Sequence, residues 1–321
     1  MQRIVQCLVI AAMLAVGFGV FSATAAYPDK QITCLQASRP GGGSDALAQI
    51  TQPVLEKYLG KGFINQYLPG ASGSIAFTRI AKQTKPDGYT VTITFTPHVY
   101  AAFIMNPKEI TYRMDDFDPI ANVVTDPNVL VVSPDSPLKT FDDFIQACKA
   151  KPGTVTVSNS GLGGDDALAI MRLEKIAGIK AQLVPFDSDA PSWQAAMAKK
   201  VDVSMNNLGV VYPQVKAGNL RVLGILSEKR YHLLPDVPTV KELGYNLVGG
   251  SSRGYSAPKG LPADVKATLI DAFKKMAADP DFIKACENRA LAIDMKYGDD
   301  YAAFFKEQVE IVSEIMATVQ K

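Results

Sequence analysis

The order of hydrophobic and polar positions predicts parallel β-sheets covered by helices. Short apolar runs, expected to be strands, alternate with stretches in which apolar residues recur every three or four positions, as on one face of a helix. Leu47, Ile50 and Val54 show this helical spacing. We expect strands at 31–37, 63–67, 89–96, 155–158, 181–185 and 201–205, and helices from about 44 and at 74–83, 165–176 and 192–199. Such alternation is typical of α/β proteins.

The region after Gly260 has a different pattern and is predicted to be almost wholly helical. Apolar residues recur at helical spacing over 263–278 and again over 301–319. Both stretches are expected to be amphipathic helices whose aromatic residues pack into the core. Before this region, Thr239 and Glu242 have capping-box spacing, which predicts that a helix starts there.

The amino terminus has the features of a secretory signal. A short basic start (M-Q-R) is followed by an apolar run from Ile4 to Phe21 and then by the small residues S-A-T-A-A. This order favours a cleaved signal peptide over 1–26 and a mature chain, beginning at Tyr27, in the periplasm. A retained membrane anchor is the alternative, because the run approaches the ~20 residues that span a bilayer. No later run has that length, so we expect the mature protein not to be embedded in a membrane.

Composition narrows the classes of function. The 321 residues include 33 Lys plus Arg against 32 Asp plus Glu, so the chain has no basic field for holding phosphates, which argues against nucleic-acid binding. Only two His residues are present, far apart, and we expect no metal site and no cofactor. The 47% of hydrophobic residues fits a folded globular protein, for which this length favours two domains.

Three cysteines follow the predicted signal, an odd number at wide spacing. Cys34 falls in a predicted strand, and Cys148 and Cys286 fall in predicted helices. This is no disulfide framework, and buried free thiols are the expected state. A Cys148–Cys286 bridge stays open as an alternative, since an exported chain meets an oxidising compartment.

Three polar, glycine-rich loops lie where a predicted strand leads into a predicted helix. They are S-R-P-G-G-G-S-D at 38–45, P-G-A-S-G-S at 69–74 and S-N-S-G-L-G-G-D-D at 158–166. Glycine lets backbone N–H groups approach a ligand closely, and a helix N-terminus adds positive potential, which together suit a carboxylate. In open α/β sheets, ligands bind beyond the carboxyl ends of the strands, where these loops should lie. Ordinary turns and caps are the alternative for any single loop.

Motifs for nucleotide binding or nucleophilic catalysis are absent. The third loop has Asp166 where the dinucleotide fingerprint needs Gly or Ala, and the first loop lacks the Gly-Lys-Ser/Thr end of a P-loop. No Gly-x-Ser-x-Gly elbow occurs either. His98 and His232 have no paired Ser or Cys motif, although His98, just after a strand that ends near Thr96, is a candidate for lining a cleft.

Several short motifs follow one another in a specific order. They are Y-P-D-K at 27–30, G-G-G-S-D at 41–45, P-G-A-S-G at 69–73, P-D-G-Y-T at 86–90, G-N-L-R-V-L at 218–223, L-P-D-V-P-T at 234–239 and A-P-K-G-L-P at 257–262. In this order and spacing, the chain resembles the extracytoplasmic receptors of tripartite tricarboxylate transporters, the Bug receptor family. The resemblance covers nearly all of the mature chain.

The resemblance implies the fold and the function. The fold would be an α/β, two-domain periplasmic-binding-protein clamshell of type II-like form, with mostly parallel sheets flanked by helices and a helical C-terminal region. Domain 1 would comprise 27–126 plus 250–321, and domain 2 would comprise 127–249. The protein would be a monomer without enzymatic activity that closes by a hinge over a small mono-, di- or aromatic dicarboxylate. It would pass this ligand to membrane permease subunits.

The ligand-binding residues carried over from the family lie in the loops, together with two candidates at a strand end. They are Ser38, Arg39, Gly42, Gly43, Ser44, Asp45, Ala71, Ser72, Gly73, Thr96, His98, Ser160, Gly161, Gly163, Asp165, Phe186, Asp187, Asn206 and Asn207.

The chain also departs from the family pattern. Arg39 stands where a small or apolar residue is usual and is expected either to pair with a distal ligand carboxylate or to face solvent. Ala167 stands near a usual His, and F-D-S at 186–188 replaces a commoner Tyr-Arg-Gly. Two other functions stay open. One is an exported hydrolase or lyase that uses Asp165 or Asp187 with His98, and the other is a co-receptor that presents a ligand to a sensor kinase.

Overall fold

The computed structural model describes residues 27–319, with side chains to residue 314, so the predicted signal peptide lies outside the described residues. The strands are β1 (Ile32–Gln36), β2 (Phe63–Tyr67), β3 (Thr90–Phe95), β4 (Phe117–Val132), β5 (Thr156–Asn159), β6 (Gln182–Pro185), β7 (Val203–Asn207), β8 (Arg221–Ile225), β9 (Gly250–Pro258) and β10 (Ala292–Tyr297). The helices are α2 (Gly43–Leu59), α3 (Ser74–Gln83), α4 (His98–Met105), α5 (Phe141–Ala150), α6 (Asp165–Ala177), α7 (Asp189–Met197), α8 (Leu208–Lys216), α9 (Ala263–Ala277), α10 (Pro280–Asn288) and α11 (Gly298–Val319), with short 3-10 turns η1 (Ala71–Gly73) and η2 (Met114–Asp116).

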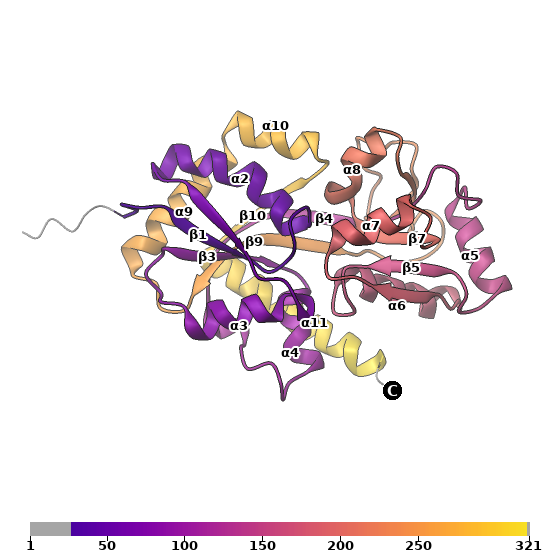
Figure 1. Ribbon diagram of the computed structural model, residues 1–321, viewed down its shortest axis with the longest axis horizontal. Coiled ribbons are helices and arrows are strands. Elements are labelled where there is room, and N and C mark those ends of the chain that lie inside the picture. The colour runs from indigo at the N-terminus through magenta and orange to yellow at the C-terminus, as the bar shows by residue number, and fades with distance from the viewer. Residues whose placement is uncertain (1–26, 320–321) are drawn as a thin grey trace, which may run out of the picture.

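The strands form one continuous sheet that divides the molecule into two halves. Its order is β2-β1-β3-β9-β4-β7-β5-β6, with β10 and β8 also paired to β4. Figure 1 shows α2, α3, α9, α10 and α11 around the β1, β3 and β9 half, and α5 to α8 around the β5 and β7 half. The two-domain α/β fold is therefore confirmed, while the domain boundaries stay a prediction.

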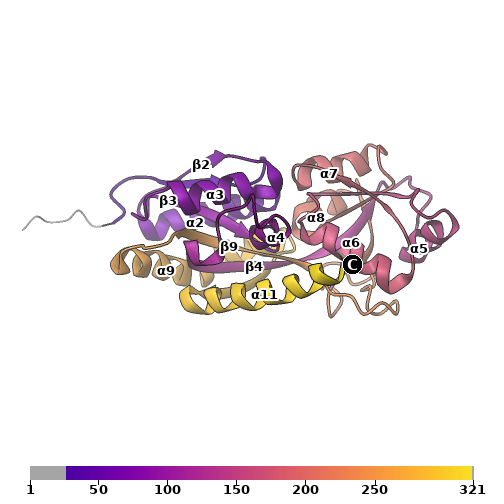
Figure 2. The same cartoon turned by 90° about the horizontal axis from the view of Figure 1, so that it is seen from below.

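The long strand β4 belongs to both halves. Along 117–127 it pairs with β9, and along 128–132 it pairs with β7 and β8. Figure 2 shows β4 running from one half into the other, with α11 beside it. Parallel pairing is confirmed for β1 with β2 and β3 and for β5 with β6 and β7. Because β4 and β9 pair antiparallel with their neighbours, the whole sheet is mixed.

Each half buries its own hydrophobic core. In the first half, apolar residues of α2 and α9, such as Leu47 and Phe273, pack against one face of the sheet. Aromatic residues of α3 and α11, such as Phe77 and Phe305, contribute to a second cluster. The other half has a separate cluster that includes Phe144 of α5. Largely separate cores, with β4 as the strand shared by both halves, suit movement about a hinge.

Three sequence-based predictions need correction. The region after Gly260 contains strand β10, a short segment that pairs antiparallel with β4, so it is not almost wholly helical. Both capping-box hydrogen bonds between Thr239 and Glu242 form, at 2.9 and 3.0 Å, but the chain turns at Gly244 (φ +94°) and no helix follows. Helix α7 begins at Asp189, three residues before the expected start.

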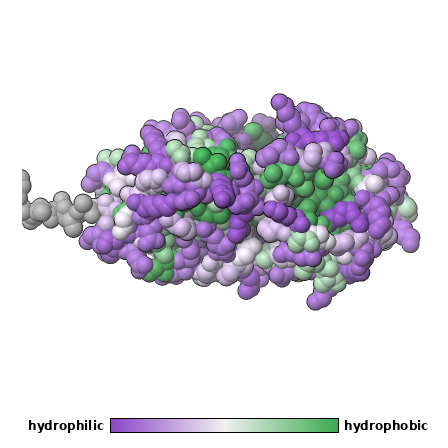
Figure 3. Space-filling view, turned by 90° about the horizontal axis from the view of Figure 1, so that it is seen from above, coloured by the Kyte–Doolittle hydropathy of each residue, from purple (hydrophilic) through white to green (hydrophobic). Residues whose placement is uncertain are grey.

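One face of the surface can be described by its hydropathy. Figure 3 shows hydrophilic residues over most of one face, with hydrophobic residues visible in patches on both halves. Scattered apolar patches of this kind are ordinary on folded proteins. Among residues 27–319, no helix has the length and hydropathy needed to cross a bilayer.

The cysteine prediction is confirmed, because Cys34, Cys148 and Cys286 are all buried and free. Burial raises the pKa of Cys34 to about 12 and that of Cys148 to about 11, so the reactive thiolate is scarce at neutral pH. We expect a thiol-specific reagent to modify none of the three thiols in the native protein and all three after denaturation, with an unchanged Tm under reducing conditions. Rapid native modification would contradict the burial.

Candidate functional site

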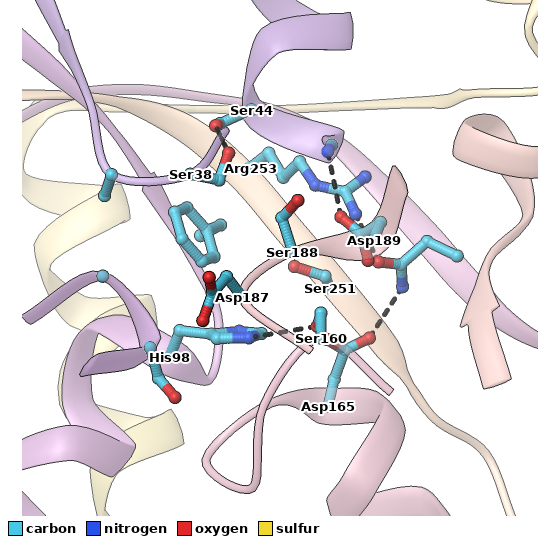
Figure 4. Close-up of a pocket in the computed structure, with 16 residues that line it drawn as sticks. Ser38, Ser44, His98, Ser160, Asp165, Asp187, Ser188, Asp189, Ser251 and Arg253 are labelled. Atoms are coloured by element: carbon cyan, nitrogen blue, oxygen red, sulfur yellow. Dashed lines mark hydrogen bonds between the residues drawn. The ribbon is translucent and has the colours of Figure 1, made fainter. Parts of the chain in front are cut away.

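One polar cavity lies between the two halves, where loops at the carboxyl ends of several strands meet. Its lining consists of Ala37, Ser38, Gly43, Ser44, Ser72, Gly73, Phe95, His98, Ser160, Asp165, Asp187, Ser188, Asp189, Asn207, Ser251 and Arg253. Figure 4 shows labelled side chains from both halves pointing toward one another around it. The cavity holds about 20 Å³, room for about one water molecule, so the halves are closed on each other.

The first half contributes the N-terminus of α2. Helix α2 begins at Gly43 without a side-chain cap of its own. The backbone N–H of Gly43 instead donates to Asp189 Oδ2 of the other half, at 3.0 Å. A carboxylate is favoured there because the helix end carries unpaired N–H groups and positive potential. Next to it, the Ser38 and Ser44 hydroxyl oxygens lie 2.6 Å apart.

Several other N–H groups of the glycine-rich loops are bonded within the protein. Gly41 donates to Asp45 Oδ2 at 2.8 Å, and Gly42 donates to the carbonyl of Arg39 at 3.2 Å. In the third loop, Gly161 donates to the side-chain oxygen of Asn159 at 3.0 Å, and Ser160 donates to Asp166. These bonds are local turns and caps, the alternative weighed from the sequence. In this closed arrangement, these four N–H groups are therefore not free for a ligand.

The loops of the two halves touch directly. A Cβ atom added to Gly161 would come 2.7 Å from Ser72 Oγ, and Gly161 has φ +122°, a conformation that glycine adopts readily. Ser72 itself is left-handed (φ +53°), uncommon for a residue with a side chain. Glycine at 161 is therefore needed for close approach of the halves.

The floor of the cavity holds a buried ion pair. Arg253 of β9 is 3% exposed, and its Nη1 lies 2.6 Å from Oδ2 of Asp126, which is fully buried. Arg253 Nη2 also donates to Asn207 Oδ1, and Gly209 N donates to Asp126 Oδ1 at 2.8 Å. Burial raises the pKa of Asp126 to about 6, so this carboxylate is ionised at neutral pH.

A second buried carboxylate belongs to Asp165 at the start of α6. Its Oδ2 accepts from Asn128 Nδ2 at 2.6 Å and from Asn207 Nδ2 at 2.7 Å. Burial raises the pKa of Asp165, because desolvation disfavours the charged form. The neighbouring Asp166 is also buried, and burial raises its pKa well above the usual range.

His98 begins α4 and is buried beside the cavity. Its Nε2 lies 3.3 Å from Ser160 Oγ, while its Nδ1 has no hydrogen-bond partner among the described residues. Burial lowers the pKa of His98, so the imidazole is neutral at pH 7. The Phe95 ring packs against it edge-on, 4.8 Å away, and no described residue bonds to Nδ1, where a third group would orient the base of a catalytic triad.

Arg39 forms an ion pair within the protein. Its Nη2 lies 2.8 Å from Asp187 Oδ2 of the other half, and both side chains are more than half exposed. From the sequence, we expected this guanidinium either to pair with a ligand carboxylate or to face solvent. The structure instead shows an ion pair with a carboxylate of the other half.

We expect Arg39→Gln to change the free energy of unfolding by less than about 1 kcal/mol, because exposed ion pairs contribute little. Ligand affinity should change less than tenfold. Denaturant unfolding and calorimetric titration would measure both, with Lys199→Gln as a control, since Lys199 forms an exposed pair with Asp135 at 2.7 Å. A larger loss of affinity would show that Arg39 binds the ligand directly.

The structure brings about half of the sequence-predicted site residues to the cavity. Those that line it are Ser38, Gly43, Ser44, Ser72, Gly73, His98, Ser160, Asp165, Asp187 and Asn207. Those that do not are Arg39, Gly42, Asp45, Ala71, Thr96, Gly161, Gly163, Phe186 and Asn206.

The residues away from the cavity have structural contacts. The carboxylate of Asp45 accepts from Gly41, Gln49 and Tyr67. Asn206 donates to Ser204 within its own half, and Phe186 packs beside a small apolar cluster there. Thr96 Oγ1 accepts from Ser252 N at 2.9 Å.

Sequence reasoning missed Arg253 and Ser251, and it gave Asp189 and Ser188 no role in binding. Arg253 lies in a polar stretch (S-S-R-G-Y-S) that does not read as a buried strand. Its pairing partner is 127 residues away along the chain. Only the register of β9 against β4 brings the two together, and no local motif reports that register. Among the described residues, no group of three or more Asp, Glu, His or Cys side chains could hold a metal ion.

Comparison with known proteins identifies related chains. Residues 47–320 match the family described as the tripartite tricarboxylate transporter family receptor. Protein BugT of Bordetella pertussis is 31% identical over 306 residues, which cover 88% of this chain and 93% of BugT.

Solved structures share the fold. One described as a periplasmic transporter is 30% identical with a TM-score of 0.87, covering 91% of this chain and 98% of that one. MatC from Rhodopseudomonas palustris, solved with bound malate, is 24% identical with a TM-score of 0.84 and covers 90% of this chain and 99% of its own.

Proposed function

The chain belongs to the tripartite tricarboxylate transporter family of receptors, and we propose that it binds a small carboxylate in the cavity between its two halves. The halves would open at the β4 and β9 crossing, admit the ligand and close over it without covalent chemistry. We propose further that the mature protein lies in the periplasm and presents the bound acid to membrane permease subunits.

One observation carries this proposal. The N-terminus of α2 already holds a carboxylate, that of Asp189, on the N–H of Gly43 at 3.0 Å. A helix end that binds a carboxylate of the protein is also suited to a carboxylate of a ligand. When the halves separate, Asp189 leaves with its own half, and an entering acid can take its place. Arg253, paired with Asp126, also lines this cavity.

A binding screen tests the proposal. The mature chain would be incubated with small mono-, di- and aromatic carboxylic acids, with thermal shift as the first measurement and calorimetric titration as the second. We expect at least one acid to raise Tm and to be recovered unmodified by native mass spectrometry, because ligand binding to the folded state stabilises it. Conversion of a bound acid into a product would instead support a hydrolase or lyase using Asp165 or Asp187 with His98.

A further inference from the structure

The charges around the cavity indicate which acids the protein should accept. We infer that the ligand carries an organic cationic group, of the ammonium or guanidinium type, beside a single carboxylate, and that simple dicarboxylates bind more weakly. This inference rests on the receptor function proposed above and names the class of its ligand.

Carboxylates outnumber cations in the lining. Asp165, Asp187 and Asp189 all line the cavity, and Arg253 is its one cationic side chain among the described residues. Asp187 is paired at 2.8 Å with Arg39, which lies outside the lining, so Asp165 and Asp189 make up the surplus of negative charge. Arg253 is committed to Asp126, at 2.6 Å. Asp165 and Asp189 form no ion pair in the described part of the chain and are held by neutral donors only, the amides of Asn128 and Asn207 and the N–H of Gly43.

Closure removes these carboxylates from water. Asp165 is 7% exposed and Asp189 is 9% exposed, so like charges there are poorly screened. A second carboxylate on the ligand would add to this repulsion, whereas a cationic group would favour the ionised form of both side chains. If the ligand's carboxylate takes the α2 N-terminus, Asp189 also loses its N–H partner. The ligand then has to supply a replacement donor.

Two hydroxyl groups give independent support. Ser188 and Ser251 line the cavity, are almost fully buried, and have hydroxyl oxygens without a hydrogen-bond partner in the described structure. Figure 4 shows both near the middle of the ring of side chains, with Asp187 to one side and Asp189 to the other. A buried polar atom without a partner costs free energy, and a serine hydroxyl can donate as well as accept, so both side chains are suited to a polar group of a ligand.

The hydrogen-bond acceptors of the cavity also match the N–H donors of an ammonium or guanidinium group. An ammonium group has three N–H donors and no acceptor, and a guanidinium has five donors in a plane. Carboxylates of Asp165, Asp187 and Asp189 and the hydroxyls of Ser188 and Ser251 offer acceptors from several directions. A second carboxylate on the ligand offers only acceptors: it could accept from the two hydroxyls, but it would meet the three Asp carboxylates as like charges.

Matched pairs of acids test the inference. Succinate, glutarate and adipate would each be compared with the amino acid in which an ammonium replaces one carboxylate, such as β-alanine for succinate, and L-lysine and L-arginine would be added. Calorimetric titration of the mature chain should show at least tenfold tighter binding for an amine-bearing acid than for its dicarboxylate partner. Tighter binding of the dicarboxylate would overturn the inference and leave the receptor function standing. Failure of every carboxylic acid in this and the preceding screen would overturn both.

Asparagine variants test which carboxylates of the cavity bind the cationic group. Asp187→Asn and Asp165→Asn should each weaken the amine-bearing ligand at least tenfold while leaving dicarboxylate binding unchanged or tighter. Asp187 is largely exposed, so its variant is expected to fold even if the buried Asp165 variant does not. Asp135→Asn, an exposed carboxylate paired with Lys199 and absent from the cavity lining, is the matched control and should change nothing. Equal losses for amines and dicarboxylates in the folded Asp187 variant would contradict the inference.

Discussion

Gly43→Val is expected to abolish ligand binding and to lower the free energy of unfolding by about 1–3 kcal/mol, the usual cost of overpacking. A Cβ atom at this position would lie 2.5 Å from Cζ, Nε and Nη2 of Arg253. A flexible side chain could move aside, but this guanidinium is buried and bonded to Asp126 and Asn207. The added atoms therefore have to displace either the ion pair or the start of α2, whose N–H is the proposed carboxylate site.

The measurement pairs calorimetric titration, using the acid that most stabilises the unmodified chain, with denaturant unfolding. Gly163→Ala is the control, because Gly163 lies in another loop near the cleft and its added Cβ would meet Met105 Sδ at an ordinary 3.6 Å. The control should keep its stability and bind within a few fold of the unmodified chain. Unchanged affinity in Gly43→Val would remove the α2 N-terminus from the binding site.

Arg253→Met should have the largest effect on stability, about 3–5 kcal/mol, because it leaves the buried Asp126 carboxylate without its partner. At roughly 2–4 °C per kcal/mol for a chain of this order of size, Tm should fall by about 10 °C. The long Met side chain fills most of the vacated volume. The loss of stability therefore comes mainly from the uncompensated charge of Asp126.

A double-mutant cycle separates charge from packing. Asp126→Asn removes the negative charge and keeps an acceptor for the N–H of Gly209. Added to Arg253→Met, it should restore a substantial part of the lost stability. Asp126→Asn alone should cost less than Arg253→Met alone, since Asp165 and Asp189 also attract Arg253 and raise its pKa. Equal losses of unfolding free energy in the two single variants would contradict the inference that negative charge is in surplus in the cleft.

Local patterns predicted six of the ten strands in the described part of the chain, β1 to β3 and β5 to β7, but not β4, β8, β9 or β10. The helix expected at 74–83 and the strand expected at 63–67 have the observed bounds of α3 and β2, because their periodicity and flanking turns act over a few residues. The Thr239–Glu242 capping box shows the limit of such signals. Its hydrogen bonds form as predicted, but Gly244 turns the chain before a helix can continue.

The candidate site was only partly predictable for the same reason. Glycine-rich loops such as 38–45 are visible as motifs, and several of their residues do reach the cavity. Whether a loop N–H faces a ligand or a neighbouring carboxylate depends on tertiary contacts, as Gly43 with Asp189 shows. Arg253 reaches the floor through strand pairing between segments far apart in sequence, and no local pattern carries that information.

The position of β9 also determines when the first half can fold. Strand β9 lies between β3 and β4, although it follows β4 by more than a hundred residues along the chain. A growing chain that has reached Val132 contains β1 to β4 but lacks the strand that joins them. The intervening segment, with its own core, can fold during this interval, since contacts between distant segments form late. The half that is synthesised first therefore finishes folding last.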